Sequence, residues 1–280
     1  MGNTQSSFVI REAIPCAALL FAITRHLQKV IDRDTQTNAQ GKVCRSPSSA
    51  RLDRAAQLDR STPRSLRQVA RNFAHCWVCC ALLDVCFARR TKARWFTLHA
   101  LANAVITAMA TPDLLKALRE PKDSMEGKCS VVPATLIPSL FIYHLSAFSN
   151  VPKDEWVHHC LFGGVIATAG LYYCPGPLQN ALAFFICGLP GGIDYAMLAA
   201  VRQGAMRPVT EKVLNTWLNV WLRSPGLVLV GYIIYVACKY GRSKMPNNVA
   251  AIVALLSAFN GNYYMQRVVA SAALNNWRPS

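Results

Sequence analysis

The chain alternates between long stretches without a charged residue and shorter basic segments. The uncharged stretches cover residues 95–112, 129–152, 156–193 and 245–266. A helix needs about 20 mostly apolar residues to cross the hydrocarbon core of a bilayer. The third stretch has 38 residues, which is enough for two such helices. The pattern therefore predicts a chain that crosses a membrane several times.

No stretch alternates apolar and polar residues with period two, as a membrane-spanning barrel strand would. Helices satisfy their own backbone hydrogen bonds inside lipid. We therefore expect an all-α protein, a polytopic transmembrane helix bundle with about seven spans. The expected helices lie at about 73–88, 95–112, 131–148, 157–173, 178–201, 225–239 and 249–266.

The fifth expected helix contains the sequence Pro190-Gly191-Gly192. Proline removes a backbone donor, and glycine has little preference for the helix. We therefore expect a kink or break at this point, with freed carbonyl groups near Phe185 and Ile186.

The first 72 residues are expected to form an N-terminal tail, followed by the bundle over residues 73–280. The apolar segment Ala13–Thr24 has 12 residues, too few for a span, so we expect it to lie in the membrane interface or to pack on the bundle. Residues 25–72 are polar and basic, and they favour a solvated linker. Attraction to anionic lipid headgroups is the alternative for this linker.

The chain begins Met1-Gly2-Asn3-Thr4-Gln5-Ser6, which fits the pattern for N-myristoylation of Gly2. A plain polar tail is the alternative. Myristoylation would make the protein a lipoprotein with its N-terminus in the cytosol.

The composition agrees with a membrane protein. Apolar residues make up 52% of the chain and charged residues only 16%, which excludes a disordered chain. The 30 Lys and Arg exceed the 14 Asp and Glu, and we assign this excess to basic loops rather than to nucleic-acid binding. Their distribution places the N-terminus in the cytosol. We expect an endoplasmic reticulum or other endomembrane location, with another organellar membrane as the alternative.

Three cysteines, Cys76, Cys79 and Cys80, share one helix face. Their spacing is not that of a zinc site. We expect them to pack at a helix interface, and we predict neither a metal nor another cofactor.

Polar residues inside the expected helices fall near one end of the bundle. They are Asp84, His99, His144, Asp194 and Asn260. The opposite helix ends look almost purely apolar. Ionisable residues within a membrane are candidates for function, so we expect a polar cavity at this end. His99, His144, Asp194 and Asn260 are the candidate lipid-binding residues. The alternative is that each side chain simply reaches water at the membrane surface.

A histidine pair, His158-His159, follows Glu155 at the start of the fourth expected helix. On a helix, Glu155 shares a face with His159 and can orient its imidazole for general-base chemistry. We therefore take Glu155, His158 and His159 as candidate catalytic residues, with His159 favoured as the group that faces the bundle.

In these segments the chain resembles the TLC-domain family, the TRAM/Lag-type membrane proteins. The resemblance covers roughly residues 73–266. It rests on the order and spacing of five segments, Leu98-His99-Ala100-Leu101, Phe141-Ile142-Tyr143-His144, Asp154-Glu155-Trp156-Val157-His158-His159, Leu189-Pro190-Gly191-Gly192-Ile193-Asp194-Tyr195 and Asn219-Val220-Trp221-Leu222-Arg223.

The resemblance implies a lipid-related function. Family members include ceramide synthases, in which the histidine pair is taken as catalytic, and proteins thought to sense, move or organise lipids. Here the pair is followed by Cys160-Leu161-Phe162-Gly163, without the hydroxyl residue that the ceramide synthases place soon after it.

Three functions remain open at this point. The first is a multi-pass protein that binds, senses or transports lipid in a polar cavity in one leaflet, without known catalysis. The second is a structural or accessory subunit of a membrane complex, with membrane-protein partners and no cavity. The third is an acyltransferase of the ceramide-synthase type. A lipid-sized cavity separates the first and third from the second.

Overall fold

The computed structural model describes residues 66–149, 156, 167–173, 176–241, 243 and 245–276. Every regular element in these residues is a helix, in agreement with the all-α expectation. The expected interfacial segment Ala13–Thr24 lies outside the described residues. So does most of the expected helix at 157–173, of which α7 (Thr168–Tyr173) is described.

Within the described residues, four helices are long and apolar enough to cross a membrane, and they cover Arg67–Arg90, Arg94–Arg119, Gly176–Arg202 and Pro208–Tyr240. α5 (Val132–Ala147) is apolar but shorter. α12 (Asn247–Asn276) has 30 residues but carries several asparagines. The membrane character expected from the uncharged stretches is therefore present in the described helices.

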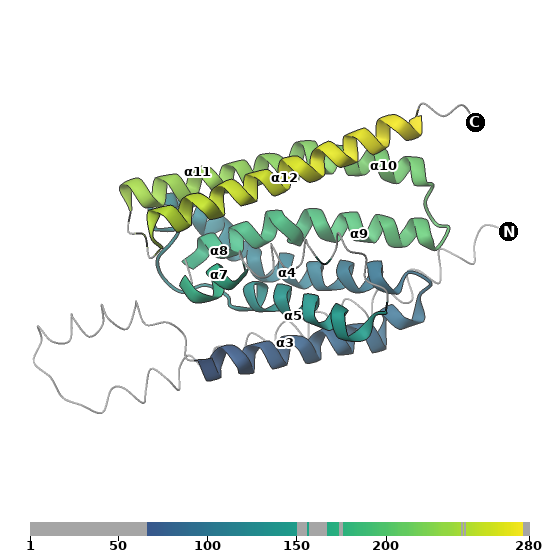
Figure 1. The fold of residues 1–280 in the computed structure, drawn as a ribbon, viewed down its shortest axis with the longest axis horizontal. Coiled ribbons are helices and arrows are strands. Elements are labelled where there is room, and N and C mark those ends of the chain that lie inside the picture. Colours follow the sequence, from purple (N-terminus) through teal and green to yellow (C-terminus); the bar gives the residue numbers. More distant parts are fainter. Residues whose placement is uncertain are drawn as a thin grey trace, which may run out of the picture. The chain divides into compact units, whose positions relative to one another are not determined.

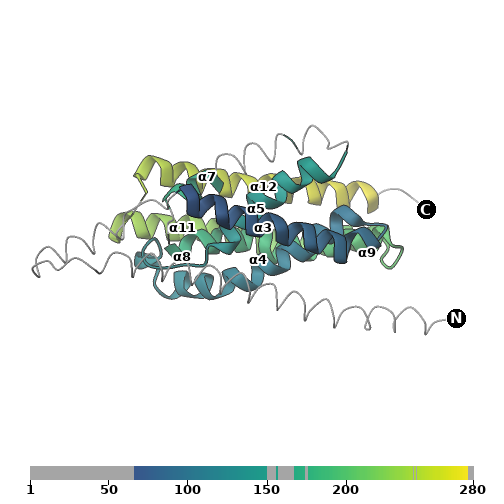
Figure 2. The same ribbon diagram turned by 90° about the horizontal axis from the view of Figure 1, so that it is seen from below.

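The helices lie side by side in three layers (Figure 1). α3 (Leu66–Cys86) packs against α5 in the outer layer that is nearest the viewer in Figure 2. α4 (Arg94–Arg119) packs against α8 (Gly176–Ala183) and α9 (Leu189–Arg202) in the middle layer.

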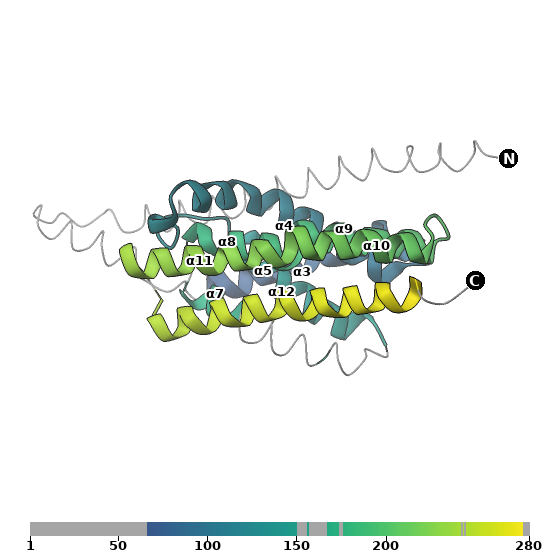
Figure 3. The same cartoon turned by 90° about the horizontal axis from the view of Figure 1, so that it is seen from above.

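The third layer contains α10 (Pro208–Leu218) and α11 (Ser224–Tyr240), which run in line beside α12 (Figure 3). Short 3₁₀ turns, η1 (Ala88–Arg90) and η2 (Pro121–Asp123), lie in the connections on either side of α4. Buried apolar side chains from α4, α8, α11 and α12 form the core between the middle and third layers.

Several helix boundaries differ from the sequence expectation. The first helix begins at Leu66, before the expected residue 73. The segment 202–224, expected to be mostly a loop, is helical from Pro208 onwards, and it joins α11 in one 33-residue helix. Its charged and amide residues favour a loop, but the side chains of Glu211, Asn215, Asn219 and Arg223 are buried in the structure.

The helix over residues 176–202 is not broken at Pro190-Gly191-Gly192, which all lie within α9. The irregularity lies just before them, because residues Phe184–Gly188 form a π-helix, η4. A second π-helix, η5 (Asn219–Arg223), also ends two residues before a proline, Pro225. Proline cannot donate to the carbonyl four residues earlier, and its ring crowds that carbonyl. In both helices that carbonyl belongs to a residue in the widened π-turn.

Candidate functional site

A cavity of about 210 Å³ lies between the middle and third layers and is also lined by α5. Leu178, Leu182, Ile186 and Asp194 line it along one face of the helix over residues 176–202. At a rise of 1.5 Å per residue, the sixteen residues from Leu178 to Asp194 correspond to roughly 24 Å. The cavity is therefore elongated along the helix axes.

The two ends of the cavity differ in chemistry. Around Leu178 the lining is mainly apolar, with Leu182, Ile234, Met245 and Val253 nearby and Gln179 as the polar exception. The other end is polar, and its lining side chains are His99, Asn103, Asp194, Tyr195, Arg223 and Asn260. Three of the expected lipid-binding residues, His99, Asp194 and Asn260, thus line one end of one cavity. An elongated site with one polar end fits an amphiphile.

A ladder of polar side chains on α10 and η5 supports the polar end. Its members are four residues apart, at Glu211, Asn215, Asn219 and Arg223, so they lie on one helix face. Asn215 Nδ2 donates to Glu211 Oε1 at 3.1 Å. Asn219 Nδ2 donates to Asn215 Oδ1 at 2.6 Å, and Arg223 Nη1 donates to Asn219 Oδ1 at 2.9 Å.

The ladder reaches across to Asp194 on α9. Asn215 Nδ2 donates to Asp194 Oδ1 at 2.7 Å. Arg223 Nη2 lies 3.8 Å from Asp194 Oδ2, a separation that allows charge pairing but is too long for a hydrogen bond. The buried Glu211 is paired with Lys212 Nζ at 3.0 Å. The ladder therefore fixes the place of Arg223 without using all of its donors.

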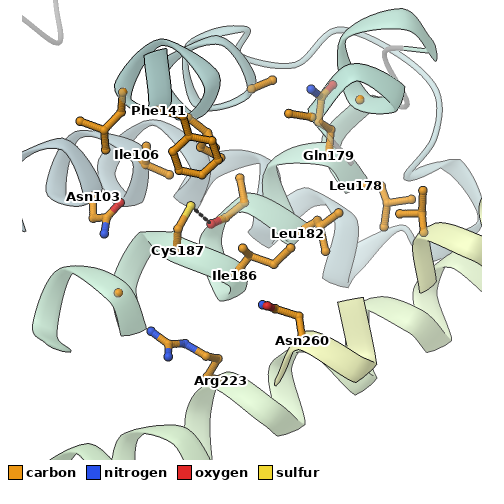
Figure 4. A pocket seen from close by; sticks show the side chains of 18 of the residues that line it. Asn103, Ile106, Phe141, Leu178, Gln179, Leu182, Ile186, Cys187, Arg223 and Asn260 are labelled. Carbon is orange, nitrogen blue, oxygen red and sulfur yellow. Dashed lines mark hydrogen bonds between the residues drawn. The ribbon is translucent and has the colours of Figure 1, made fainter. Parts of the chain in front are cut away.

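Two polar atoms at the cavity lack a hydrogen-bond partner among the described residues. They are Arg223 Nε and Asn260 Oδ1, and both residues are more than nine-tenths buried. Figure 4 shows Arg223 and Asn260 extending into the cavity from the side opposite Ile186 and Cys187. An unsatisfied buried polar group costs roughly 1–3 kcal/mol. A ligand that bonds to both atoms would offset this cost.

The backbone next to the polar end leaves room for these side chains. A Cβ atom on Gly191 would lie 2.9 Å from Asn103 Nδ2 and 3.8 Å from Arg223 Nη2. The π-helix η5 contains Asn219 and Arg223, and η4 contains Cys187 and Ile186. A π-turn shifts the side chains that follow it around the helix, and such turns are frequent at functional sites.

A stack of aromatic rings closes the polar end. The His99 and His144 rings are 4.2 Å apart, as are His99 and Tyr195, and Trp95 stacks on His144 at 4.2 Å. His99 Nδ1 is 3.0 Å from the carbonyl oxygen of Trp95. A carbonyl only accepts, so Nδ1 carries the proton. His99 and His144 are thus in direct ring contact, but His144 lies behind His99 rather than in the cavity lining.

Asp84 takes part in a separate network at the same end. Its buried carboxylate accepts hydrogen bonds from Arg94 at 2.6 and 2.8 Å, from Arg89 at 2.9 Å and from Tyr143 at 2.7 Å. These partners come from α4, η1 and α5. Asp84 thus joins the outer layer to α4 and does not line the cavity.

The expectation that the opposite helix ends are almost purely apolar is wrong. Asp113 Oδ2 accepts from Asn180 Nδ2 at 2.6 Å and from the Ser130 backbone at 2.9 Å. Asn180 also donates to the Ser130 carbonyl at 2.8 Å. The uncharged stretch ends at residue 112, so the sequence predicts Asp113 in a loop. In the structure α4 continues to Arg119, and Asp113 ties the following connection to α8.

The other candidate residues cannot all be placed. Gly2, Glu155, His158 and His159 lie outside the described residues. Cys76, Cys79 and Cys80 are buried with free thiols. Within the described part of the chain, no group of three or more His, Cys, Asp or Glu side chains could hold a metal ion.

The sequence reasoning did not select Asn103, Glu211 or Asn215 as site residues. Arg223 entered only through the family resemblance. The signal for the ladder was present, because polar residues recur every four positions from 211 to 223. The sequence alone predicts a loop for this segment, and in a loop a four-residue spacing does not place side chains on one face.

Comparisons with known proteins identify no family for this chain. No family model matches it, and no solved structure matches it. The chain is similar to ATP phosphoribosyltransferases of Burkholderia mallei (strain SAVP1) and Burkholderia pseudomallei (strain K96243). Each is 34% identical over 128 residues, which are 45% of this chain and 54% of the relative. The chain thus spans about half the length of the curated relatives it matches, and a partial match of this kind assigns no activity to the cavity.

Proposed function

We propose that the protein binds a membrane lipid in the cavity between α4, α8–α9 and α11–α12. The supporting observation is the elongated cavity, which is mainly apolar around Leu178 and polar around Arg223 and Asn260. A lipid has the same division into chain and head. Lipid binding, sensing and transport all need such a site.

The apolar end would hold the hydrocarbon chain. Ligand pockets are typically lined by hydrophobic side chains with a few placed polar groups that fix orientation. Leu182, Ile186 and Val253 would contact the chain, while Arg223 and Asn260 would contact the head group. Three of the helices around the cavity, over residues 94–119, 176–202 and 208–240, are long and apolar enough for a bilayer, so a lipid could reach the cavity from the membrane.

The cavity also bears on the alternatives. A structural subunit of a membrane complex needs no amphipathic cavity, so we favour lipid binding over that function. An acyltransferase would depend on Glu155, His158 and His159, which lie outside the described residues. We further propose that the protein belongs to the TLC-domain family and forms a bundle of about seven spans. Its N-terminus would lie in the cytosol, and its location would be an endomembrane.

A matched pair of substitutions on α12 tests lipid binding. Val253 lines the cavity, whereas Leu255, two residues further on, is 71% exposed. In the full chain purified in mild detergent, Val253→Phe should lower the amount of lipid that co-purifies, as measured by native mass spectrometry. Leu255→Phe places the same phenyl group outside the cavity and should retain the wild-type amount.

Both variants should elute as the wild type does in size-exclusion chromatography, since Val253→Phe adds volume next to existing space. Equal lipid content in Val253→Phe, Leu255→Phe and wild type would overturn the proposal. Absence of bound lipid from the wild type would do the same.

A further inference from the structure

We infer that the ligand of the cavity is a single-chain lipid with an uncharged, hydroxyl-bearing head group. This inference rests on the proposed function and names the class of lipid. It comes from the charges and the unpartnered polar atoms at the polar end.

The charges that line the cavity already balance. Among the described residues, Asp194 and Arg223 are the only Asp, Glu, Lys or Arg side chains in the lining. They face each other, with Arg223 Nη2 at 3.8 Å from Asp194 Oδ2. Behind them, the carboxylate of Glu211 is paired with Lys212 Nζ at 3.0 Å.

A charged head group would upset this balance. An anion next to Arg223 would also lie close to the Asp194 carboxylate, and the site would hold an uncompensated negative charge. A cation would compete with Arg223 for Asp194, whose Oδ1 already accepts from Asn215. Away from water, an uncompensated charge is strongly unfavourable.

The unpartnered atoms indicate what the head group must offer instead. Arg223 Nε is a donor and needs an acceptor, and Asn260 Oδ1 is an acceptor and needs a donor. A hydroxyl group provides both functions, since it donates one hydrogen and accepts through its lone pairs. Adjacent hydroxyls, as on a glycerol head group, can bond to both atoms at once.

The shape of the cavity favours one chain over two. Its volume of about 210 Å³ is small for a site that runs along most of a membrane helix. The lining residues on the helix over residues 176–202 follow a single helical face, so this helix offers one continuous track for a hydrocarbon chain. A monoacyl lipid fits this form.

Three lipids with the same 18-carbon chain length test the inference. 1-Oleoylglycerol is uncharged, 1-oleoyl-lysophosphatidic acid adds one phosphate to it, and oleylamine is cationic. Binding of each to the full chain in detergent micelles is measured by competition with radiolabelled 1-oleoylglycerol. We expect 1-oleoylglycerol to bind about tenfold more tightly than either charged lipid, a factor that corresponds to one lost or unbalanced interaction.

Variants at the polar end should change this order in opposite directions. Asp194→Asn leaves Arg223 without its counter-charge and should favour lysophosphatidic acid. Arg223→Gln leaves Asp194 unbalanced and should favour oleylamine. Asn260→Leu removes an acceptor and should weaken 1-oleoylglycerol binding, whereas Gln266→Leu, at an exposed position of α12, should leave it unchanged.

The outcomes separate the inference from the proposed function. If wild-type protein binds lysophosphatidic acid or oleylamine as tightly as 1-oleoylglycerol, the inference is wrong but lipid binding stands. If none of the three lipids binds, both fail. The measurement on the wild type decides this even if a charge-removing variant does not fold.

Discussion

The side chain of Arg223 is held in position by residues that do not line the cavity themselves. Asn219 accepts from its guanidinium, and Asn215 supports Asn219 and at the same time donates to Asp194. A single amide thus connects α10 with α9 and also sets the distance between the two charges of the cavity. Polar networks in a low-dielectric interior are strong when every member is satisfied, and they are costly to disrupt.

Replacing Asn215 by alanine should therefore destabilise the protein. The buried carboxylate of Glu211 and the partly buried carboxylate of Asp194 would each lose a donor, and we expect a loss of about 2 kcal/mol. Thermal unfolding in detergent measures the change. Asn248→Ala, at an exposed position near the start of α12, is the control and should melt as the wild type does. An unchanged melting temperature in Asn215→Ala would show that the ladder does not contribute to stability.

Asp84 plays the corresponding role between α3, α4 and α5. Its side chain is fully buried and is bonded to Arg94, Arg89 and Tyr143. Asp84→Asn keeps the shape but removes the charge and places an amide donor opposite two arginines. Because both arginines are partly exposed, we expect a loss of roughly 1–3 kcal/mol rather than that of a fully buried pair.

Urea unfolding followed by circular dichroism would measure this loss. Asp123→Asn alters an exposed carboxylate and should have no measurable effect. If the two variants unfold at the same urea concentration, Asp84 does not hold the layers together as described.

At the scale of the elements, the two π-helices explain how two proline-containing helices remain continuous. η4 and η5 lie against each other, and both contribute cavity residues. Next to them, α11 approaches η4 so closely that a Cβ atom on Gly226 would overlap the ring of Phe185.

Gly226→Ala should therefore destabilise the protein by about 1–3 kcal/mol, because a methyl group is forced into a packed interface. Gly231→Ala is a matched control on the same helix, since its Cβ would lie 4.0 Å from the nearest atom outside its own helix. Alanine also has the higher helix propensity, so this control should be neutral or slightly stabilising. Thermal unfolding of both variants makes the comparison, and equal losses would contradict the packing at Phe185.

At the scale of the whole molecule, α4 separates the connections of the bundle into two groups at opposite ends. It runs from Arg94 to Arg119, so the connection around Lys92 and that around Lys122 lie at opposite ends of a helix long enough for the bilayer. The connection after α9, around Gln203, returns to the end where α4 begins. With a cytosolic N-terminus, Lys122 would face the cytosol.

Single cysteines introduced at these positions test the arrangement. In sealed vesicles with the cytosolic face outward, a membrane-impermeant thiol reagent should label Lys122→Cys above the level of the unchanged protein. It should label Lys92→Cys and Gln203→Cys only after detergent is added. Labelling of Lys92→Cys and Lys122→Cys from the same face would contradict α4 as a span, and the exact reverse pattern would invert the orientation.

The sequence by itself determined that the described chain is helical and apolar enough to enter a membrane. These properties follow from long uncharged stretches, and such stretches leave a chain in lipid few structures other than helices. The sequence also placed His99, Asp194 and Asn260 at the same helix ends, because depth along a helix follows directly from residue number.

Only the tertiary structure decided what lies beside each of these residues. The ladder from Glu211 to Arg223 was assigned to a loop because its polar residues resemble a solvated segment, yet neighbouring helices bury them. Arg223 pairs with Asp194, which lies 29 positions earlier in the chain. Asp113 and Asn180, which form a hydrogen bond, are 67 positions apart. Such contacts depend on which helix faces pack together. Hydrophobic runs without a polar face carry no information about that choice.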